Sequence, residues 1–467
     1  MSSPKQDAKR PFRIIIVGGG IAGLSAAIAL RGPNRHITIL EQSSFLREVG
    51  AAISLQPNAS KILEQRWGVG AGTDTTEPAC PRIVDRGFRI YSTAGELVKE
   101  IPLAKGRDAY GADRVVYHRR DLHALLLHAA TSASRPHPPA SIRLRARVVA
   151  CDPEAGTVTL ASNGDDDGEG DREDAEATTT TTTTTTLTAD LIIAADGIRS
   201  ALRASALGQD PPPSAIPTGL SAYRFMVPIS RLRAAAPAFT ARIDPAAPYT
   251  SMVMGWDRRL VMGPCRTSPS DPNAGDYAVV ALVPDELMAG NDAAPRQGAS
   301  WNSEGELEAL REAYRDFPEW VTGMFGLVEG VIGLWQLRDL EPLERWCRGR
   351  VVLVGDAAHA MLPTQGQGAS QSLEDAEALG AVFEDVEGWV EKEEVGRRLE
   401  EMVACRYERA TLIQAYSRQA ARPATNGKDA KVTLTTAEFM DYNCNYNGAR
   451  DFQQRQRNGT TMAMVNG

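Results

Sequence analysis

The chain has 467 residues, of which 43% are hydrophobic and 24% are charged, a balance typical of a globular protein and not of a disordered or membrane-embedded one. Because this length exceeds what one hydrophobic core usually organises, we expect two domains. The net charge of −8 argues against a large basic surface for nucleic acid or anionic lipid, and it favours small-molecule chemistry.

The first thirteen residues are polar and basic and lack a hydrophobic signal core, and no later stretch is apolar enough to span a membrane. We therefore expect a cytoplasmic protein. The six cysteines are scattered, with no CxxC pair and no histidine cluster at metal-ligand spacing. This pattern predicts reduced, structural cysteines and no metal site.

Residues 13–40 predict a strand, a glycine turn, a helix and a second strand. In the turn, Gly18 permits a tight bend, Gly20 lets a pyrophosphate approach the backbone, and Gly23 lets the helix pack closely on the strand. Glu41 ends the second strand, where it can accept hydrogen bonds from a ribose. This arrangement predicts dinucleotide binding, but it does not separate FAD from NAD.

A helix is predicted around residues 121–130, and an acidic, glycine-rich and threonine-rich segment follows at 163–188. We interpret that segment as an expanded surface hairpin without chemistry, because such polar tracts bury too little area to offset the entropy of ordering. After it, the apolar residues 189–195 predict a buried strand that ends in the sequence Ala-Asp196-Gly.

From residue 217 to about 340 the pattern changes to short strands punctuated by proline and glycine, which indicates an antiparallel substrate-binding sheet. An apolar strand at 350–354 then returns to the first scaffold, and residues 370–384 predict a helix. Between them, residues 355–369 form a glycine-rich loop that begins Gly-Asp356 and ends in Ala369. Such a loop can hold a ribityl hydroxyl, phosphate or flavin oxygens, and a plain dehydrogenase does not need it.

The predicted fold class is therefore α/β, with a Rossmann-like cofactor domain interleaved with an antiparallel-sheet substrate domain and followed by a helical C-terminal part. The predicted boundaries are 12–80, 110–216 and 341–416 for the cofactor domain, 81–109 and 217–340 for the substrate domain, and 417–467 for the C-terminal tail. We expect the residues after about 418 to be partly loose, because they are polar and weakly periodic.

The three glycine-containing motifs, in this order, resemble the flavoprotein monooxygenases that include salicylate hydroxylase, 3-hydroxybenzoate 6-hydroxylase and fungal secondary-metabolite hydroxylases. The resemblance covers roughly residues 12–416 and extends to residues 48–53, 57–59 and 118–123. It implies that the dinucleotide is FAD and that NAD(P)H binds only transiently as reductant, since a single glycine fingerprint is present. Residues 441–448 resemble a family tail motif, with Asn447 where an acid is usual.

The resemblance also implies roles for particular residues. Glu41 would bind the adenosine ribose, Ala52 and Arg119 would contact FAD, and Asp196 would help to bridge FAD and NAD(P)H. Asp356 would bind the ribityl-phosphate region, and Ala369 would meet the flavin ring. In such enzymes the reduced flavin forms a hydroperoxide that transfers one oxygen atom to an electron-rich ring.

For substrate chemistry we predict Arg224 and Tyr223, in a segment that resembles the strand lining the substrate pocket in this family. Arg224 can stabilise a phenolate or position a carbonyl, whereas its structural alternative is an ion pair, and that of Tyr223 is core packing. Trp256 and Met254 are further candidates for stacking on an aromatic substrate, with plain core packing as the alternative. His359 is interpreted as a structural residue of the cofactor loop.

Two departures from the family pattern bear on the substrate. Gly263 stands where many relatives have the tyrosine of a Tyr-Pro pair, and Leu220 stands where some have a histidine. We therefore keep three hypotheses: hydroxylation of a phenolic or polyketide-derived aromatic, epoxidation of an indole or alkene, and a non-catalytic FAD-binding regulator. The expected partners are a small aromatic substrate and O2, with neither nucleic acid nor membrane, for a monomer or homodimer.

Overall fold

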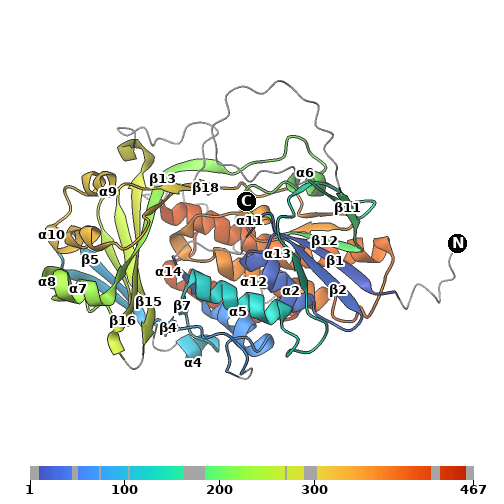
Figure 1. Ribbon diagram of the computed structural model, residues 1–467, viewed down its shortest axis with the longest axis horizontal. Helices are drawn as coiled ribbons and strands as arrows, with labels where there is room; N and C mark the ends of the chain where they lie inside the picture. Colours follow the sequence, from blue (N-terminus) through green and yellow to red (C-terminus); the bar gives the residue numbers. More distant parts are fainter. Residues whose placement is uncertain are drawn as a thin grey trace.

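The computed structural model describes residues 10–44, 51–72, 75–103, 106–161, 185–268, 271–288, 302–421 and 432–458. Figure 1 shows two large sheets side by side, with a parallel sheet and its helices on the right and an antiparallel sheet with its helices on the left. The predicted α/β fold class is confirmed. Residues 48–50 of the second supporting segment and 163–184 of the polar insertion lie outside the described residues.

The first sheet is built around a central strand that is buried on both faces, as is usual where helices or a second sheet cover a parallel sheet. Its strand order is β19 (Cys347–Arg348), β20 (Val351–Leu353), β12 (Leu191–Ala194), β1 (Phe12–Val17), β2 (Arg35–Leu40) and β8 (Ser141–Arg143), and all neighbours but β19 and β20 are parallel. Because β1, β12 and β20 are adjacent and parallel, the loops that follow them emerge at one edge of the sheet.

Helices cover one face of this sheet, and a small antiparallel sheet covers the other. The covering helices are α2 (Ile21–Leu30), α5 (Arg119–Thr131) and α12 (Gly368–Val382). The small sheet contains β9 (Val148–Asp152), β10 (Thr157–Leu160) and β11 (Thr185–Thr188). The last two strands, which flank the polar insertion, pair as an antiparallel hairpin.

The second large sheet has eight strands, and Figure 1 shows its helices on the side away from α2 and α12. Its order is β17 (Asn302–Glu304), β18 (Gly333–Asp339), β13 (Ile216–Pro228), β16 (Asp271–Pro284), β15 (Arg259–Ser268), β14 (Thr250–Met254), β5 (Gly87–Ser92) and β6 (Leu97–Pro102). The covering helices include α7 (Ile229–Ala235), α8 (Pro237–Thr240), α9 (Leu307–Ala313) and α10 (Glu319–Thr322).

A third sheet joins the two halves, with the order β3 (Ala52–Leu55), β7 (Val115–His118) and β4 (Arg82–Val84). Its residues Ile83 and Val116 pack against Cys265 and Ala278 of the eight-stranded sheet. The remaining short helices are α3 (Pro57–Ser60), the π-helix η1 (Lys61–Arg66), α4 (Gly106–Tyr110), α6 (Arg203–Leu207), η2 (Asp285–Met288), η3 (Gly323–Leu327), α11 (Asp356–His359) and η4 (Pro363–Gln365).

The C-terminal part is helical, as predicted, and it contains α13 (Lys392–Ala421), α14 (Thr436–Cys444) and α15 (Ala449–Arg457). The expectation that the tail is loose is wrong for residues 432–458. The reason is that apolar side chains are spaced so that they bury: Tyr416 stacks on Phe439 with ring centroids 3.6 Å apart, and Tyr446 and Phe452 pack with Ile62. Among the described residues, no helix is both long and apolar enough to cross a bilayer.

Candidate active site

The three predicted glycines of the first loop have different tasks. Gly18 has φ +106°, and a Cβ there would lie 2.3 Å from the carbonyl oxygen of Ala195. At Gly23 a Cβ would lie 2.0 Å from the Gly18 oxygen. At Gly20, which immediately precedes α2, a Cβ would meet nothing within 4 Å. Gly18 and Gly23 are therefore required for close packing, whereas the backbone at Gly20 faces open space, as a phosphate-binding loop requires.

Two side chains hold the middle of this loop from opposite sides. Glu41 accepts a hydrogen bond from the Gly19 amide at Oε2 (2.8 Å) and one from the Ser43 amide at Oε1 (2.9 Å). The buried His123, from α5, lies with Nε2 2.8 Å from the Gly19 carbonyl oxygen. Because a carbonyl can only accept, His123 carries its proton on Nε2.

The loops after β12 and β20 meet the glycine loop. Asp196 accepts hydrogen bonds at Oδ2 from the amides of Ala201 (2.7 Å) and Leu202 (3.2 Å), while its buried Oδ1 has no partner. Burial raises the pKa of Asp196. The backbone of Asp196 lies beside the glycine loop, because a Cβ at Gly18 would come within 3.2 Å of the Asp196 amide nitrogen. The arrangement fits a bound group that supplies a hydrogen-bond donor.

The third loop contacts α2 directly. Gly355 has φ +59°, and a Cβ there would lie 2.8 Å from the Cβ of Ala22. The next residue, Asp356, begins α11 and is exposed. Among the residues of this loop, Gly366 packs close to Ser54 of β3, and Ser370 Oγ accepts a hydrogen bond from the Gln56 amide (3.2 Å).

Ala52, Arg119 and Ala369 are also brought to this region. Ala52 begins β3 opposite His118, and the Arg119 amide donates to the Ala51 carbonyl at 2.9 Å. Ala369 lies in the first turn of α12. It follows Gly368, at which an added Cβ would meet nothing within 4 Å, as at Gly20. The residues predicted to contact FAD therefore surround one cradle made from the first, second and third motifs, β3 and the start of α5.

A fully buried charge network supports this cradle, and the sequence reasoning did not identify it. Asp375 accepts from the Gly355 amide (2.9 Å) and pairs with His359 Nε2 (2.6 Å) and Arg406 Nε (2.9 Å). Glu374 pairs with both Arg406 and Arg409. Although burial opposes ionisation, the charges of Arg409 and Arg406 lower the pKa of Glu374, and those of His359 and Arg406 lower the pKa of Asp375. The structural interpretation of His359 agrees with these contacts.

On the eight-stranded sheet, Tyr223 and Arg224 point to opposite faces, as consecutive strand residues must. Tyr223 is 0% exposed and belongs to the apolar core under the outer helices. Burial raises the pKa of Tyr223 to about 12. Arg224 lies on the other face, toward the cradle, with its guanidinium 5.0 Å from the ring centroid of Trp335. The structure therefore does not bring these two predicted residues together.

Arg224 lies between the sheet and the cradle, near enough to Arg119 for the charge of Arg119 to affect it. The buried Nε of Arg224 has no hydrogen-bond partner among the described residues. Burial, followed by the nearby positive charge of Arg119, lowers the pKa of Arg224 to about 10. Gly263 of β15 lies on the same face of the sheet as Arg224, because it pairs with Ala278 while the preceding Met262 belongs to the opposite core. A buried guanidinium nitrogen without a partner among the described residues suits an anionic ligand.

Trp256 and Met254 do not line this region. Trp256 lies in the turn between β14 and β15 and is 89% exposed, and Met254 is 39% exposed. Their prediction as contacts of a substrate pocket is therefore not supported, because Met254, at the end of β14, and Trp256, in the turn that follows, both reach solvent.

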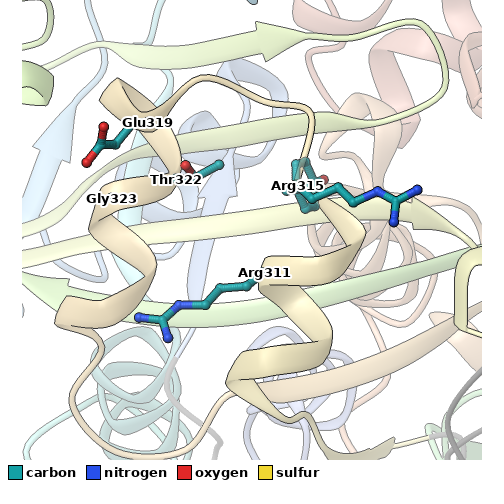
Figure 2. Close-up of a pocket in the computed structure, with 6 residues that line it drawn as sticks. Arg311, Arg315, Glu319, Thr322 and Gly323 are labelled. Carbon is teal, nitrogen blue, oxygen red and sulfur yellow. The ribbon is translucent and has the colours of Figure 1, made fainter.

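A separate hollow of about 220 Å³ lies on the outer helices and is lined by Arg311, Tyr314, Arg315, Glu319, Thr322 and Gly323. Figure 2 shows the Arg311 and Arg315 side chains pointing in different directions. Each is engaged by an acid of its own helical turn, Glu308 and Glu312, at 2.7 Å. This hollow is remote from the cradle and offers no convergent charge. Within the described ranges, no cluster of histidine, cysteine and acidic residues could hold a metal ion.

Comparison with known proteins places this geometry in a family. Residues 16–47 match the family described as an NAD(P)-binding Rossmann-like domain, and residues 334–393 match the FAD binding domain. The chain is 31% identical over 380 residues to hispidin-3-hydroxylase from Neonothopanus nambi, covering 79% of this chain and 80% of the relative. It is 31% identical over 418 residues to the FAD-dependent monooxygenase atnJ from Arthrinium sp, covering 89% and 85%.

The fold comparison agrees. A solved substrate complex of salicylate hydroxylase superposes with a TM-score of 0.64 at 25% identity, covering 97% of this chain and 95% of that one. The predicted resemblance and the predicted FAD cofactor are thereby confirmed. The chain belongs to the FAD-dependent monooxygenases of the aromatic-hydroxylase family.

Proposed function

We propose that the chain uses NAD(P)H and O2 to hydroxylate a phenolic or polyketide-derived aromatic molecule in secondary metabolism, and that this substrate binds as an anion. The observation that carries the proposal is Arg224, whose buried guanidinium Nε lacks a hydrogen-bond partner in the part of the chain that the structure describes. The similarity to hispidin-3-hydroxylase supports a small aromatic substrate.

The cradle has features that fit FAD, and each motif would hold a different part of it. Gly20 and the first turn of α2 would face the pyrophosphate, Glu41 the adenosine ribose, and Asp356 the ribityl-phosphate region. Ala52, Arg119 and Ala369 would border the flavin, and Asp196 would lie between FAD and NAD(P)H. When bound, FAD would accept a hydride from NAD(P)H and activate O2 for transfer of one oxygen atom.

The chain's own residues would bind, orient and desolvate the substrate. A phenolate or carboxylate at Arg224 would supply the missing acceptor and offset the repulsion from Arg119, so the ionised form would bind best. An ionised phenol is the more electron-rich ring, which suits oxygen transfer. Trp335, already stacked near the Arg224 guanidinium, would help to exclude water from this pair. We assign Tyr223 to core packing and not to catalysis.

The substitution Arg224→Gln tests this assignment. A charge-assisted hydrogen bond contributes about 1.5–3 kcal/mol, so KM for an ionised substrate should rise by roughly 10- to 150-fold while FAD affinity is retained. Arg231→Gln, on the exposed side of α7 with its side chain 48% exposed, is the matched control and should leave both unchanged. An unchanged KM in Arg224→Gln would remove the anion-binding role.

Gly263 favours a second candidate, epoxidation of a neutral indole or alkene. The glycine leaves this position of the sheet without a phenol that could deprotonate a substrate, and an alkene needs no base. If this candidate is right, neutral indoles or alkenes should stimulate NAD(P)H oxidation more than phenols do, and Arg224→Gln should have little effect on them. A non-catalytic regulator would instead bind FAD without NAD(P)H oxidation in the presence of any substrate.

A further inference from the structure

The C-terminal helix α15 docks on α12, whose first turn borders the cradle (Figure 1), and α14 packs on α3 and, through Phe439, on Tyr416 of α13. The C-terminal helices make buried contacts, both polar and apolar, with the rest of the protein, so they do not merely lie on its surface. Three residues of α12 carry the connection: Glu374, Asp375 and Glu377.

Arg409 of α13 links the network to the end of α14. Its guanidinium is 1% exposed and donates to both oxygens of Glu374, at 2.7 and 2.8 Å. Its other bonds go to the carbonyl oxygens of Tyr442 and Asn443, both at 3.0 Å. The tail therefore supplies two of the acceptors that this buried cation needs.

Glu377 holds the start of α15. Its buried carboxylate accepts at Oε2 from the Ala449 amide (2.8 Å) and from the Tyr446 hydroxyl (3.3 Å). From the π-helix, Lys61 Nζ donates to the Cys444 carbonyl (2.9 Å) and to Asn447 Oδ1 (2.7 Å). Burial lowers the pKa of Lys61 to about 8.

The same helix also contacts α3 and the third glycine-containing loop. Glu374 accepts from Asn58 Nδ2 at 2.5 Å, and Asp375 holds the Gly355 amide. Ser370, one turn earlier, bonds to the Gln56 amide beside β3. Adjacent residues of α12 thus bind the tail and the loops, so a shift of this helix moves both.

We propose that residues 436–457 form a C-terminal clasp that positions α12 against the flavin, so that docking of the clasp and binding of FAD strengthen each other. The inference rests on the proposed placement of FAD at the first turn of α12. Such coupling is reciprocal: FAD must stabilise the docked clasp by the same factor by which the clasp raises FAD affinity. Arg409, Glu377 and Lys61 act here as positioning residues and do not touch the reacting atoms.

The substitution Ala449→Pro tests the clasp at the start of α15. It removes the amide that Glu377 accepts, and proline is tolerated because residue 449 is the first of α15. Lys61→Met is a second variant that removes the bonds to Cys444 and Asn447 from the opposite side. Arg397→Ala on α13, outside the clasp, is the control, because the ion pair of Arg397 with Glu394 is on the surface, with the Arg397 side chain 59% exposed.

Two measurements are made on each full-length variant: the Kd for FAD, by fluorescence titration of the apoprotein, and hydrogen exchange of residues 436–457 with and without FAD. We expect Ala449→Pro and Lys61→Met to weaken FAD binding on the order of 10-fold, Arg397→Ala to leave it unchanged, and FAD to slow exchange across the clasp of the unaltered protein. The clasp is refuted if either folded variant shows faster exchange in this segment but unchanged FAD affinity, or if FAD leaves exchange there unaffected. Failure of the unaltered protein to bind FAD would instead count against the proposed function.

Discussion

The first-loop glycines offer a matched pair of substitutions in which the same added methyl group should have opposite effects. At Gly23 the methyl would lie 2.0 Å from the Gly18 carbonyl oxygen and 3.2 Å from Ile16 Cγ2, both in the packed interior. Overpacking of this kind costs about 1–3 kcal/mol and outweighs the gain of about 1 kcal/mol from replacing a helical glycine with alanine. Gly23→Ala should therefore lower the stability of the apoprotein.

At Gly20 the methyl meets no protein atom within 4 Å, and the backbone, at φ −77° and ψ −173°, is extended and open to any residue. Gly20→Ala should change apoprotein stability by less than about 1 kcal/mol. The methyl would, however, occupy the space in which a pyrophosphate approaches, and loss of one charge-assisted hydrogen bond, at about 1.5–3 kcal/mol, should weaken FAD by roughly 10- to 150-fold.

The assay is urea denaturation of both apoproteins together with fluorescence titration of FAD. If Gly20→Ala binds FAD as tightly as the unaltered protein, the cradle is misplaced. If Gly23→Ala is as stable as Gly20→Ala, the packing argument fails.

Three further predictions concern the supports of the cradle and its surroundings. His123→Leu removes the donor to Gly19 and should weaken FAD about 10-fold, while the same titration of Arg397→Ala, which changes an exposed residue of α13, should show no change. Asp375→Asn breaks a fully buried pair and should cost about 3–5 kcal/mol in denaturation, against less than about 1 kcal/mol for the exposed Asp385→Asn. Because the folded protein lowers the pKa values of Glu374 and Asp375, these carboxyl groups bind fewer protons in the folded protein than in the unfolded chain. Their contribution to the free energy of unfolding is therefore present at neutral pH and is lost as the pH falls below about 4. In Asp375→Asn the free energy of unfolding should decrease less steeply over this acidic range. Trp256→Ser should alter neither stability nor KM, and a rise in KM would show that the exposed indole takes part in substrate binding.

The sequence predicted the parts of this site that depend on local backbone demands. Gly18 and Gly23 are required by close contacts within the loop, and Gly20 leaves space beside the start of α2. A strand followed by a loop and a helix places each motif at the edge of the sheet. The order of β20, β12 and β1 then brings the three loops together. Consecutive side chains of a strand point to opposite faces of the sheet, so the sequence alone was sufficient to predict that Tyr223 and Arg224 of β13 do not line the same pocket.

The buried network could not be predicted in the same way, because its members are distant in sequence. Glu374 and Asp375 on α12 meet Arg406 and Arg409 on α13 only after both helices pack. The sequence does contain one signal. Two adjacent acidic residues lie within an apolar helix, and two arginines lie three residues apart in the next helix. If both helices are buried, these acidic residues and arginines must form ion pairs with each other. The tail was misjudged because its composition is polar, although its few aromatic residues are placed where they bury.

The most direct test of the central claim is the origin of the oxygen atom in the product. The FAD-loaded protein is incubated with NAD(P)H, a panel of ionisable phenols and isotopically labelled O2, and the products are analysed by mass spectrometry. We predict substrate-stimulated NAD(P)H oxidation and one labelled oxygen atom in a hydroxylated aromatic product. A loaded protein that oxidises NAD(P)H no faster with any aromatic compound, and yields no labelled product, would contradict the proposed aromatic monooxygenase activity.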